Sequence, residues 1–153
     1  MIALNYPECL IEVCGKSVKV FDISVPSCFA ETTYSSHKEA LEKAHFCGYI
    51  SYICCQERPC LLIDKDVNLI KIANSGARLI MDLDPRNMKR PFSDFWQSQI
   101  AYKRWRNKLK KQGEITQNCK LVSSDGDLFS ICLYATLIKV ASLRLVLVEE
   151  VEK

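Results

Sequence analysis

The stretch from Pro59 to Leu83 combines two short apolar runs, a polar turn and a helix start, an order that few folds can accommodate. Cys60 to Ile63 is the first run and Leu69 to Ala73 the second, and both are compatible with strands. Between them stands a cluster of residues that favours turns: Asp64, Lys65, Asp66 and Asn68. Asn74 follows, where its side-chain oxygen can accept from the free amides of a first helical turn. The stretch predicts strand, turn, strand and helix, in that order.

The end of the chain predicts three successive strands between Gly113 and Val151, the first two joined by a turn at Asp125-Gly126. Alternate residues along each strand share a face, so one apolar set is expected to face the core. This set is Ile115, Gln117, Cys119, Leu121, Phe129, Ile131, Leu133, Ala135, Leu143, Leu145 and Leu147. A long helix is expected before these strands, from Ser93 to a C-cap at Gly113. Four of its side chains share one helical stripe: Phe95, Tyr102, Trp105 and Leu109.

Together these segments resemble a PAS domain, in which a hairpin ends in an asparagine, a short helix follows and a three-stranded meander closes the sheet. The resemblance covers about residues 59 to 151. It implies an α+β fold with a PAS-like five-stranded antiparallel sheet and helices on one face, plus an N-terminal hairpin and a flanking helix. We therefore expect three parts: a hairpin extension over 1–35, a flanking dimerisation helix over 36–58 and a PAS-like domain over 59–153.

The first 35 residues predict a β-hairpin. Cys9 to Val13 and Val18 to Ile23 are β-prone runs, and Gly15 stands between them at a position that suits a tight turn with positive φ. Ser27 to Tyr34 is expected to be a connection. The sequence assigns no function to this hairpin.

Ser36 and Glu39 have the spacing of a capping box, which predicts a helix from His37 to about Cys55. Its second half is apolar on nearly every side, so it is expected to be buried on two sides. One stripe is rich in small residues: Leu41, Ala44, Gly48, Tyr52 and Cys55. PAS domains often dimerise through such a helix, so the resemblance makes this stripe a homodimer interface. The alternative is a helix that the hairpin buries within its own chain.

The composition is that of a folded protein, with 48% hydrophobic and 25% charged residues in a chain of 153. No apolar run reaches the roughly 18 residues that span a bilayer, and no signal peptide is evident, so we expect a cytoplasmic protein without a membrane segment. Nine cysteines without a CxxC pair are expected to be mainly reduced core residues. A metal site is not expected, because Cys47, Cys54, Cys55 and Cys60 lack the usual zinc spacing.

Several chemistries are disfavoured. Haem-binding PAS sensors usually supply a histidine from the helix that here spans Ser93 to Lys111, and the two histidines, His37 and His45, lie elsewhere. Asn118-Cys119 lacks the helical neighbours of a flavin photosensor, so the resemblance argues against flavin as well as haem and leaves the cofactor unknown. With no glycine-rich phosphate loop and no nucleophile elbow, we expect no enzymatic activity.

Between Arg86 and Lys111 the chain carries nine basic residues against the single acid Asp94: Arg86, Lys89, Arg90, Lys103, Arg104, Arg106, Lys108, Lys110 and Lys111. Such a run can meet phosphate or an acidic partner. A lysine-rich outer face of a helix with an apolar stripe is more often simply solvated, so we expect no direct binding of nucleic acid.

The resemblance implies a sensory or regulatory domain that binds a small molecule in an internal cavity and signals through a dimer to a downstream effector. The ligand is expected against Tyr102, Trp105, Cys119 and Phe129. Asn74 and Gln117 are the expected polar contacts. Two alternatives stay open: a ligand-free dimerisation or interaction module, and a cysteine-based redox sensor. The sequence is compatible with a stand-alone regulator and with the N-terminal piece of a longer receptor or transcription factor.

Overall fold

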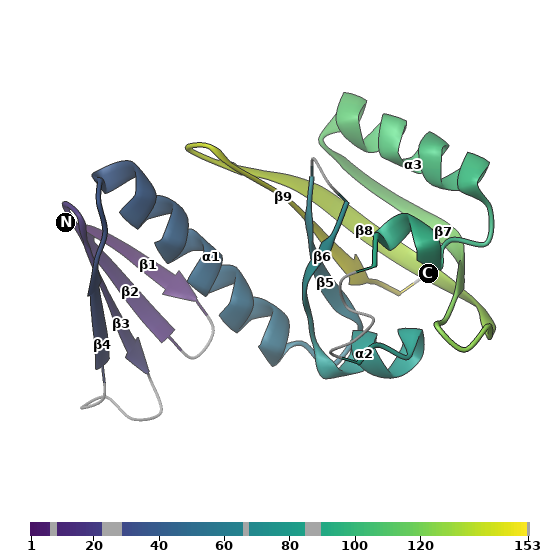
Figure 1. Ribbon diagram of the computed structural model, residues 1–153, viewed down its shortest axis with the longest axis horizontal. Helices are drawn as coiled ribbons and strands as arrows, with labels where there is room; N and C mark the ends of the chain where they lie inside the picture. The colour runs from purple at the N-terminus through teal and green to yellow at the C-terminus, as the bar shows by residue number, and fades with distance from the viewer. Residues whose placement is uncertain (7–8, 23–28, 66–67, 85–89, 153) are drawn as a thin grey trace. The chain divides into compact units, whose positions relative to one another are not determined.

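The computed structural model describes residues 1–6, 9–22, 29–65, 68–84 and 90–152 (Figure 1). By its internal contacts the chain divides into two compact units, one made of residues 1–55 and 139–143 and the other of residues 56–138 and 144–153. Each unit has its own sheet and its own hydrophobic core. Within the described ranges, no helix is both long enough and apolar enough to cross a membrane.

The first unit is a four-stranded antiparallel sheet with one long helix packed on it (Figure 1). The strands lie in sequence order: β1 (Ile2–Tyr6), β2 (Cys9–Cys14), β3 (Ser17–Asp22) and β4 (Phe29–Thr33). The helix α1 spans His37–Cys55. The hydrophobic core of this unit is formed by Ile11, Val13 and Val18 of the sheet with Ala40 and Ala44 of α1.

The predicted hairpin is confirmed, with Cys14 opposite Ser17 and Gly15 at φ +58°, but it is only the centre of the sheet. The expectation of a connection from Ser27 to Tyr34 is wrong for Phe29–Thr33, which forms β4, and β1 was not predicted at all. Both are edge strands, ordered by hydrogen bonds to β2 and β3 rather than by an apolar pattern of their own. Ile23 and residues 24–28 lie outside the described residues.

The predicted start of α1 is confirmed. The Ser36 hydroxyl accepts from the Glu39 amide at 3.1 Å, as a capping box requires. The Glu39 carboxylate accepts from the amide and hydroxyl of Ser35, one residue before the position that the motif predicts. The helix is therefore capped from both sides at its first turn.

The second unit is a five-stranded antiparallel sheet in the order β6-β5-β9-β8-β7. Its strands are β5 (Cys60–Asp64), β6 (Ile70–Ala73), β7 (Glu114–Val122), β8 (Leu128–Val140) and β9 (Leu143–Glu150). The predicted strand, turn, strand and helix are confirmed, since β5 pairs with β6 and α2 (Ser75–Met81) follows Asn74. The turn at Asp125-Gly126 is also found, with Gly126 at φ +93°.

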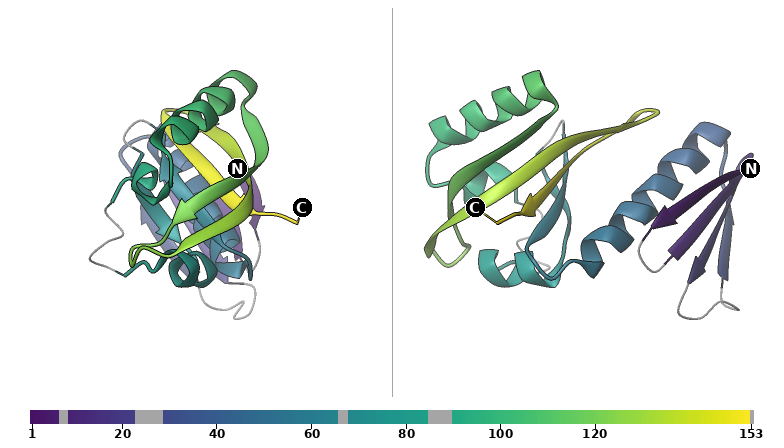
Figure 2. Two further views of the ribbon diagram at one scale, coloured as in Figure 1. Left: turned by 90° about the vertical axis from the view of Figure 1, so that its right-hand side faces the viewer. Right: turned by 180° about the vertical axis from the view of Figure 1, so that it is seen from behind.

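Two helices lie against one side of this sheet (Figure 2), and residues of both belong to its core. The helix α3 spans Gln99–Gln112 and ends, as predicted, at Gly113, whose φ is +79°. The predicted start at Ser93 is wrong: Phe92–Phe95 forms a 3₁₀ turn, Trp96 bridges to Leu121 of β7, and Ser98 caps α3 by accepting from Ala101. A side-chain cap at Ser98 and a strand-like residue before it therefore set the boundary.

The core-facing sets of β7 and β8 were predicted correctly for residues such as Ile115, Leu121 and Ile131. The prediction for β9 is wrong. Val146 and Val148 face the helices, and Leu145 and Leu147 belong to the opposite side of the strand. Four consecutive apolar residues from 145 to 148 are all buried, so the sequence offers no alternation from which to read the face.

Candidate functional site

Asn74 holds the start of the second unit together. Its Oδ1 accepts from the amides of Cys60 at 3.1 Å and Ala77 at 2.9 Å. Its Nδ2 donates to the carbonyls of Gln56 at 3.1 Å and Arg58 at 2.8 Å. An amide side chain offers two donors and two strong acceptor sites, so all four are used within the fold. In the structure the Asn74 side chain joins α2, β5 and the residues before β5, although the sequence predicted it as a polar contact for a ligand.

The space between α3 and the sheet is occupied by an aromatic cluster, which we define as Phe92, Trp96, Tyr102 and Trp105. Ring centroids lie between 5.3 Å (Trp96 to Trp105) and 6.1 Å (Phe92 to Trp96), the range of favourable aromatic pairs. All four side chains are buried. Tyr102 and Trp105 were predicted as cavity walls, whereas Phe92 and Trp96 were missed because they lie outside the helical stripe.

Two small cavities lie beside this cluster among the residues that the structure describes. The first has a volume of about 20 Å³ and lies between α3, β8, β9 and the turn after β5. The second, of about 10 Å³, is lined by apolar residues that include Phe92 and Phe129. Pockets that bind small organic molecules usually measure roughly 300–1,000 Å³. As the side chains are placed, each of these two cavities has room for about one water molecule.

The aromatic cluster contains two unsatisfied hydrogen-bond donors. Trp96 and Trp105 are 4% and 2% exposed, and neither indole Nε1–H has an acceptor among the described residues. A buried donor without a partner costs about 1–3 kcal/mol, so native cores rarely contain one. Within the described residues, the aromatic cluster thus holds two neighbouring indole donors that lack a hydrogen-bond acceptor.

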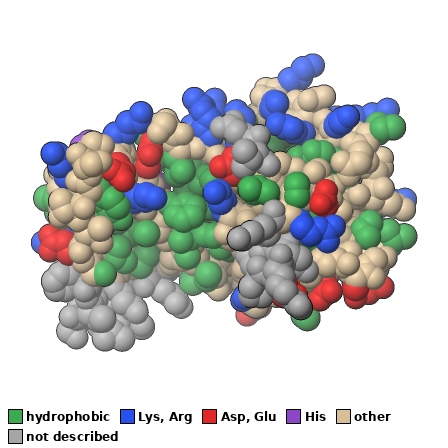
Figure 3. Space-filling model, in the orientation of Figure 1, with side chains coloured by type: hydrophobic (Ala, Val, Ile, Leu, Met, Phe, Trp, Pro, Cys, Tyr) green, Lys and Arg blue, Asp and Glu red, His purple; other side chains and the backbone are tan. Residues whose placement is uncertain are grey.

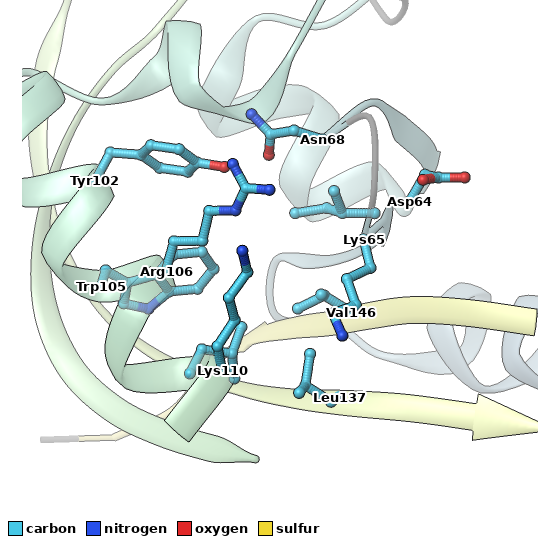
Figure 4. Close-up of a pocket in the computed structure, with 11 residues that line it drawn as sticks. Asp64, Lys65, Asn68, Tyr102, Trp105, Arg106, Lys110, Leu137 and Val146 are labelled. Atoms are coloured by element: carbon cyan, nitrogen blue, oxygen red, sulfur yellow. The ribbon is translucent and has the colours of Figure 1, made fainter. Parts of the chain in front are cut away.

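The first cavity opens beneath a rim of polar side chains, and we call the cavity and rim together the α3 hollow (Figure 4). Its floor is apolar, with Ile63, Trp105, Leu109, Leu137 and Val146. Its rim carries Lys65 and Asn68 from the turn after β5, and Tyr102, Arg106 and Lys110 from α3. Burial raises the pKa of Tyr102, while the charge of Arg106 and a hydrogen bond with the Asn68 side chain act in the opposite direction. From the sequence, Arg106 and Lys110 were expected on a solvated helix face and Lys65 in a turn.

The other predicted ligand contacts lie on the sheet side of the same core. Phe129 is half-buried and lines the second cavity. Cys119 is 2% exposed, and its Sγ donates to the carbonyl of Gln117 at 3.5 Å. Burial raises the pKa of the Cys119 thiol to about 12, so it stays protonated. The Gln117 side chain is half-buried on the same face of β7.

The residues predicted as a dimer interface have different surroundings. Ala44 belongs to the core that α1 shares with its own sheet, and a Cβ at Gly48 would overlap the ring of Tyr6 from β1. The first unit thus explains the small residues at both positions, as the alternative of a helix covered within its own chain requires. Leu41 and Tyr52 are half-buried, and Cys55 is exposed. A homodimer interface on α1 stays a prediction, and it would have to be formed by these three residues.

The other predicted groups are dispersed or lie on the surface. Cys54 and Cys55 are exposed and Cys60 is fully buried, and the part of the chain that the structure describes holds no cluster of three or more potential metal ligands. Basic side chains gather over α3 (Figure 3), where Lys103, Arg104, Lys108 and Lys111 are exposed. Arg86 and Lys89 lie outside the described residues.

Comparison with known proteins gives structural matches alone. No protein-family model matches the sequence, and no curated protein matches it. A PAS domain from a two-component sensor histidine kinase matches with a TM-score of 0.60 at 14% identity, covering 72% of this chain and 98% of that one.

Two further matches extend this result. The PAS domain, in complex with ethanol, of a LuxR-family transcriptional regulator from Burkholderia thailandensis has a TM-score of 0.54 at 14% identity and covers 67% of this chain and 95% of that one. A PAS domain of an HTR-like protein from Haloarcula marismortui has a TM-score of 0.56 at 11% identity and covers 76% of this chain and 97% of that one. The strand order, the helices on one face and these matches agree, and the chain therefore has a PAS-like fold.

Proposed function

We propose that this chain is a regulatory module of signal transduction that acts through contacts with other protein chains, with the core of its PAS-like unit filled by its own side chains. The observation that carries the proposal is the aromatic cluster with its two residual cavities of about 20 and 10 Å³. The neighbouring structures support the signalling part, since they include domains of a sensor histidine kinase, a transcriptional regulator and the nitrogen regulation protein NR(II). In this role the unit is not catalytic.

The test uses the two tryptophans, which are the only two in the chain. Both lie in the aromatic cluster, so the two indole N–H signals in a proton–nitrogen correlation spectrum, taken together, report on the packing of the core. A filled core predicts that a library of metabolite-sized molecules leaves both signals in place. A molecule that shifts both signals, saturably and at one per chain, would contradict the filled core.

A second candidate function is the sensing of a small molecule within the core, and the unpartnered indole N–H groups of Trp96 and Trp105 favour it. A ligand with a hydrogen-bond acceptor would satisfy one or both donors, and the side chains would have to move apart to admit it. In that case the bound molecule would move the indole proton signals downfield. Trp96→Phe and Trp105→Phe, each of which removes an N–H, would weaken its binding.

Signalling through a homodimer is part of the proposal, on the surface of α1 that includes Leu41, Tyr52 and Cys55. Sedimentation of the full chain over a wide range of concentration tests it. Leu41→Glu introduces a charge at a half-buried position and should shift the protein toward monomer. A wild-type chain that stays monomeric throughout would refute the homodimer and leave contact with a different protein as the route of signalling.

A further inference from the structure

The rim of the α3 hollow brings together hydrogen-bond donors from two elements that are far apart in sequence. Tyr102, Arg106 and Lys110 are spaced four residues apart and so lie on one stripe of α3. Figure 4 shows their side chains reaching toward the turn that carries Lys65 and Asn68. One hydroxyl, one amide and three cationic groups therefore surround a single opening.

Among the described residues, the charges at this rim are unbalanced. Three cations line the hollow against one carboxylate, Asp64, which points away from the opening (Figure 4). Ion pairs within the described residues join Arg58 to Glu152 and Arg90 to Asp94, and neither involves a cation of the hollow. Arg106 and Lys110 are also like charges four residues apart, an arrangement that destabilises a helix. An anion between them would remove this repulsion.

We infer that the rim of the α3 hollow binds a phosphate group. A carboxylate offers two oxygens in one plane, whereas a phosphate offers oxygens in several directions and can accept from α3 and from the opposite turn together. A guanidinium can hold two such oxygens, and an ammonium binds phosphate as a point charge. The site goes beyond the proposed function, since it lies at the surface of the second unit and requires no space within the aromatic cluster.

In this site the rim supplies the charged groups that bind the phosphate, and the floor is apolar. The cavity of about 20 Å³ beneath the rim is too small for an organic group, so the phosphate stays at the level of the charged side chains. Lys110 is exposed, and Arg106 and Lys65 are half-buried, so the position is open to solvent. The phosphate is therefore either the free ion or a group on a molecule that remains outside.

The test is calorimetric titration of the full chain with inorganic phosphate, at an ionic strength held constant with chloride. We expect saturable binding of one phosphate per chain. Arg106→Gln and Lys110→Gln should each weaken it about tenfold, because each removes charge-assisted hydrogen bonds. Lys110 is exposed, so its variant keeps the test valid even if Arg106→Gln perturbs folding.

Lys108→Gln and Lys111→Gln are the matched controls, since each removes one positive charge from an exposed position of α3 that does not line the hollow. They should bind phosphate within about twofold of wild type, because exposed charges are screened by salt. Absence of saturable binding would overturn the site, and so would equal losses in the controls, which would mean diffuse attraction to the basic helix.

Two further ligands, acetate and phenyl phosphate, test which chemical class of anion the site binds. Acetate should bind far more weakly than phosphate, and equal affinity would overturn the assignment to a phosphate group. Phenyl phosphate distinguishes the two sources of the group: binding as tight as that of inorganic phosphate supports a phosphorylated molecule, and exclusion of phenyl phosphate supports the free ion. Failure of phosphate to bind would leave the filled core untouched, because the core is tested by a shift of both indole signals and Trp96 does not line the α3 hollow.

Discussion

The Asn74 side chain makes four hydrogen bonds to the backbone around it. It caps α2 and at the same time ties β5 to the residues that precede it, with four hydrogen bonds at 2.8 to 3.1 Å. Asn74→Ala would leave two amides and two carbonyls without this partner. We predict a loss of about 3 kcal/mol in the free energy of unfolding, measured by urea denaturation.

Asn74→Asp separates the two roles of this side chain. Asparagine and aspartate cap helices about equally well, so a residue that only caps α2 would tolerate the change. Aspartate has no donors for the carbonyls of Gln56 and Arg58 and would place a carboxylate beside them, so we predict a loss of about 2 kcal/mol. Asn107→Ala, at an exposed position of α3, is the control and should change stability by less than about 0.5 kcal/mol.

The buried thiol of Cys119 should make the free energy of unfolding depend on pH in the alkaline range. Its pKa is raised from 9.0 to about 12 by burial, so between these values the folded chain keeps a proton that the unfolded chain releases. Stability must then fall as the pH rises above about 9, by at most about 1.4 kcal/mol per pH unit from this thiol. Cys119→Ala should show a shallower decline. Urea midpoints that fall in parallel for the two proteins would contradict the buried thiol.

At the scale of elements, the contact between α1 and β1 explains a glycine within a helix. Alanine at Gly48 should gain about 1 kcal/mol of helix propensity, but its Cβ would overlap the Tyr6 ring, whose hydroxyl is 3.0 Å from His45 Nδ1. The ring would have to move and lose that hydrogen bond. We predict that Gly48→Ala destabilises the chain by about 1 kcal/mol.

The effect of Gly48→Ala on stability should change sign when Tyr6 is removed, and this tests the explanation. In a Tyr6→Ala background the obstacle is gone, so Gly48→Ala should stabilise the chain by about 1 kcal/mol through helix propensity. Chemical denaturation of the four proteins of this cycle measures both effects. Stabilisation in both backgrounds would mean that Tyr6 does not restrict Gly48, and a change in dimer dissociation alone would return Gly48 to the predicted dimer interface.

The elements that the sequence predicts best are those with local signals. Asn74, the capping box at Ser36 and the glycine at 113 each fix a helix end by a hydrogen bond or a backbone conformation that belongs to nearby residues. The start of α3 was predicted at Ser93, before the observed first residue, Gln99. The structure uses Ser98 instead, since Trp96 pairs with Leu121, which is distant in sequence.

The candidate site was predicted in part, for a related reason. Tyr102 and Trp105 could be identified because they repeat on one stripe of a helix. The hydrogen bonds of Asn74 and the position of Arg106 in the same hollow as Asn68 depend on tertiary contacts, and no periodicity reveals them. The size of the cavities is likewise set by how four aromatic rings pack together, which a pattern of apolar residues does not specify.

At the scale of the whole molecule, each of the two compact units has a distinct core. The first buries Ile11, Val13 and Val18 under α1, and the second buries the aromatic cluster under α3. A small molecule bound within the PAS-like unit should therefore act first on the second core. If the core is filled, the regulation that we propose would instead act through surfaces, such as the rim of the α3 hollow or the exposed side of α1.

The measurement that tests the filled core most directly is native mass spectrometry of the full chain, purified without added ligand and compared with its denatured mass. A filled core predicts a native mass equal to that of one chain, or to a whole multiple of it, with no stoichiometric adduct. An organic adduct at one per chain that Trp105→Phe weakens would contradict it and would establish that the aromatic cluster opens to hold a ligand.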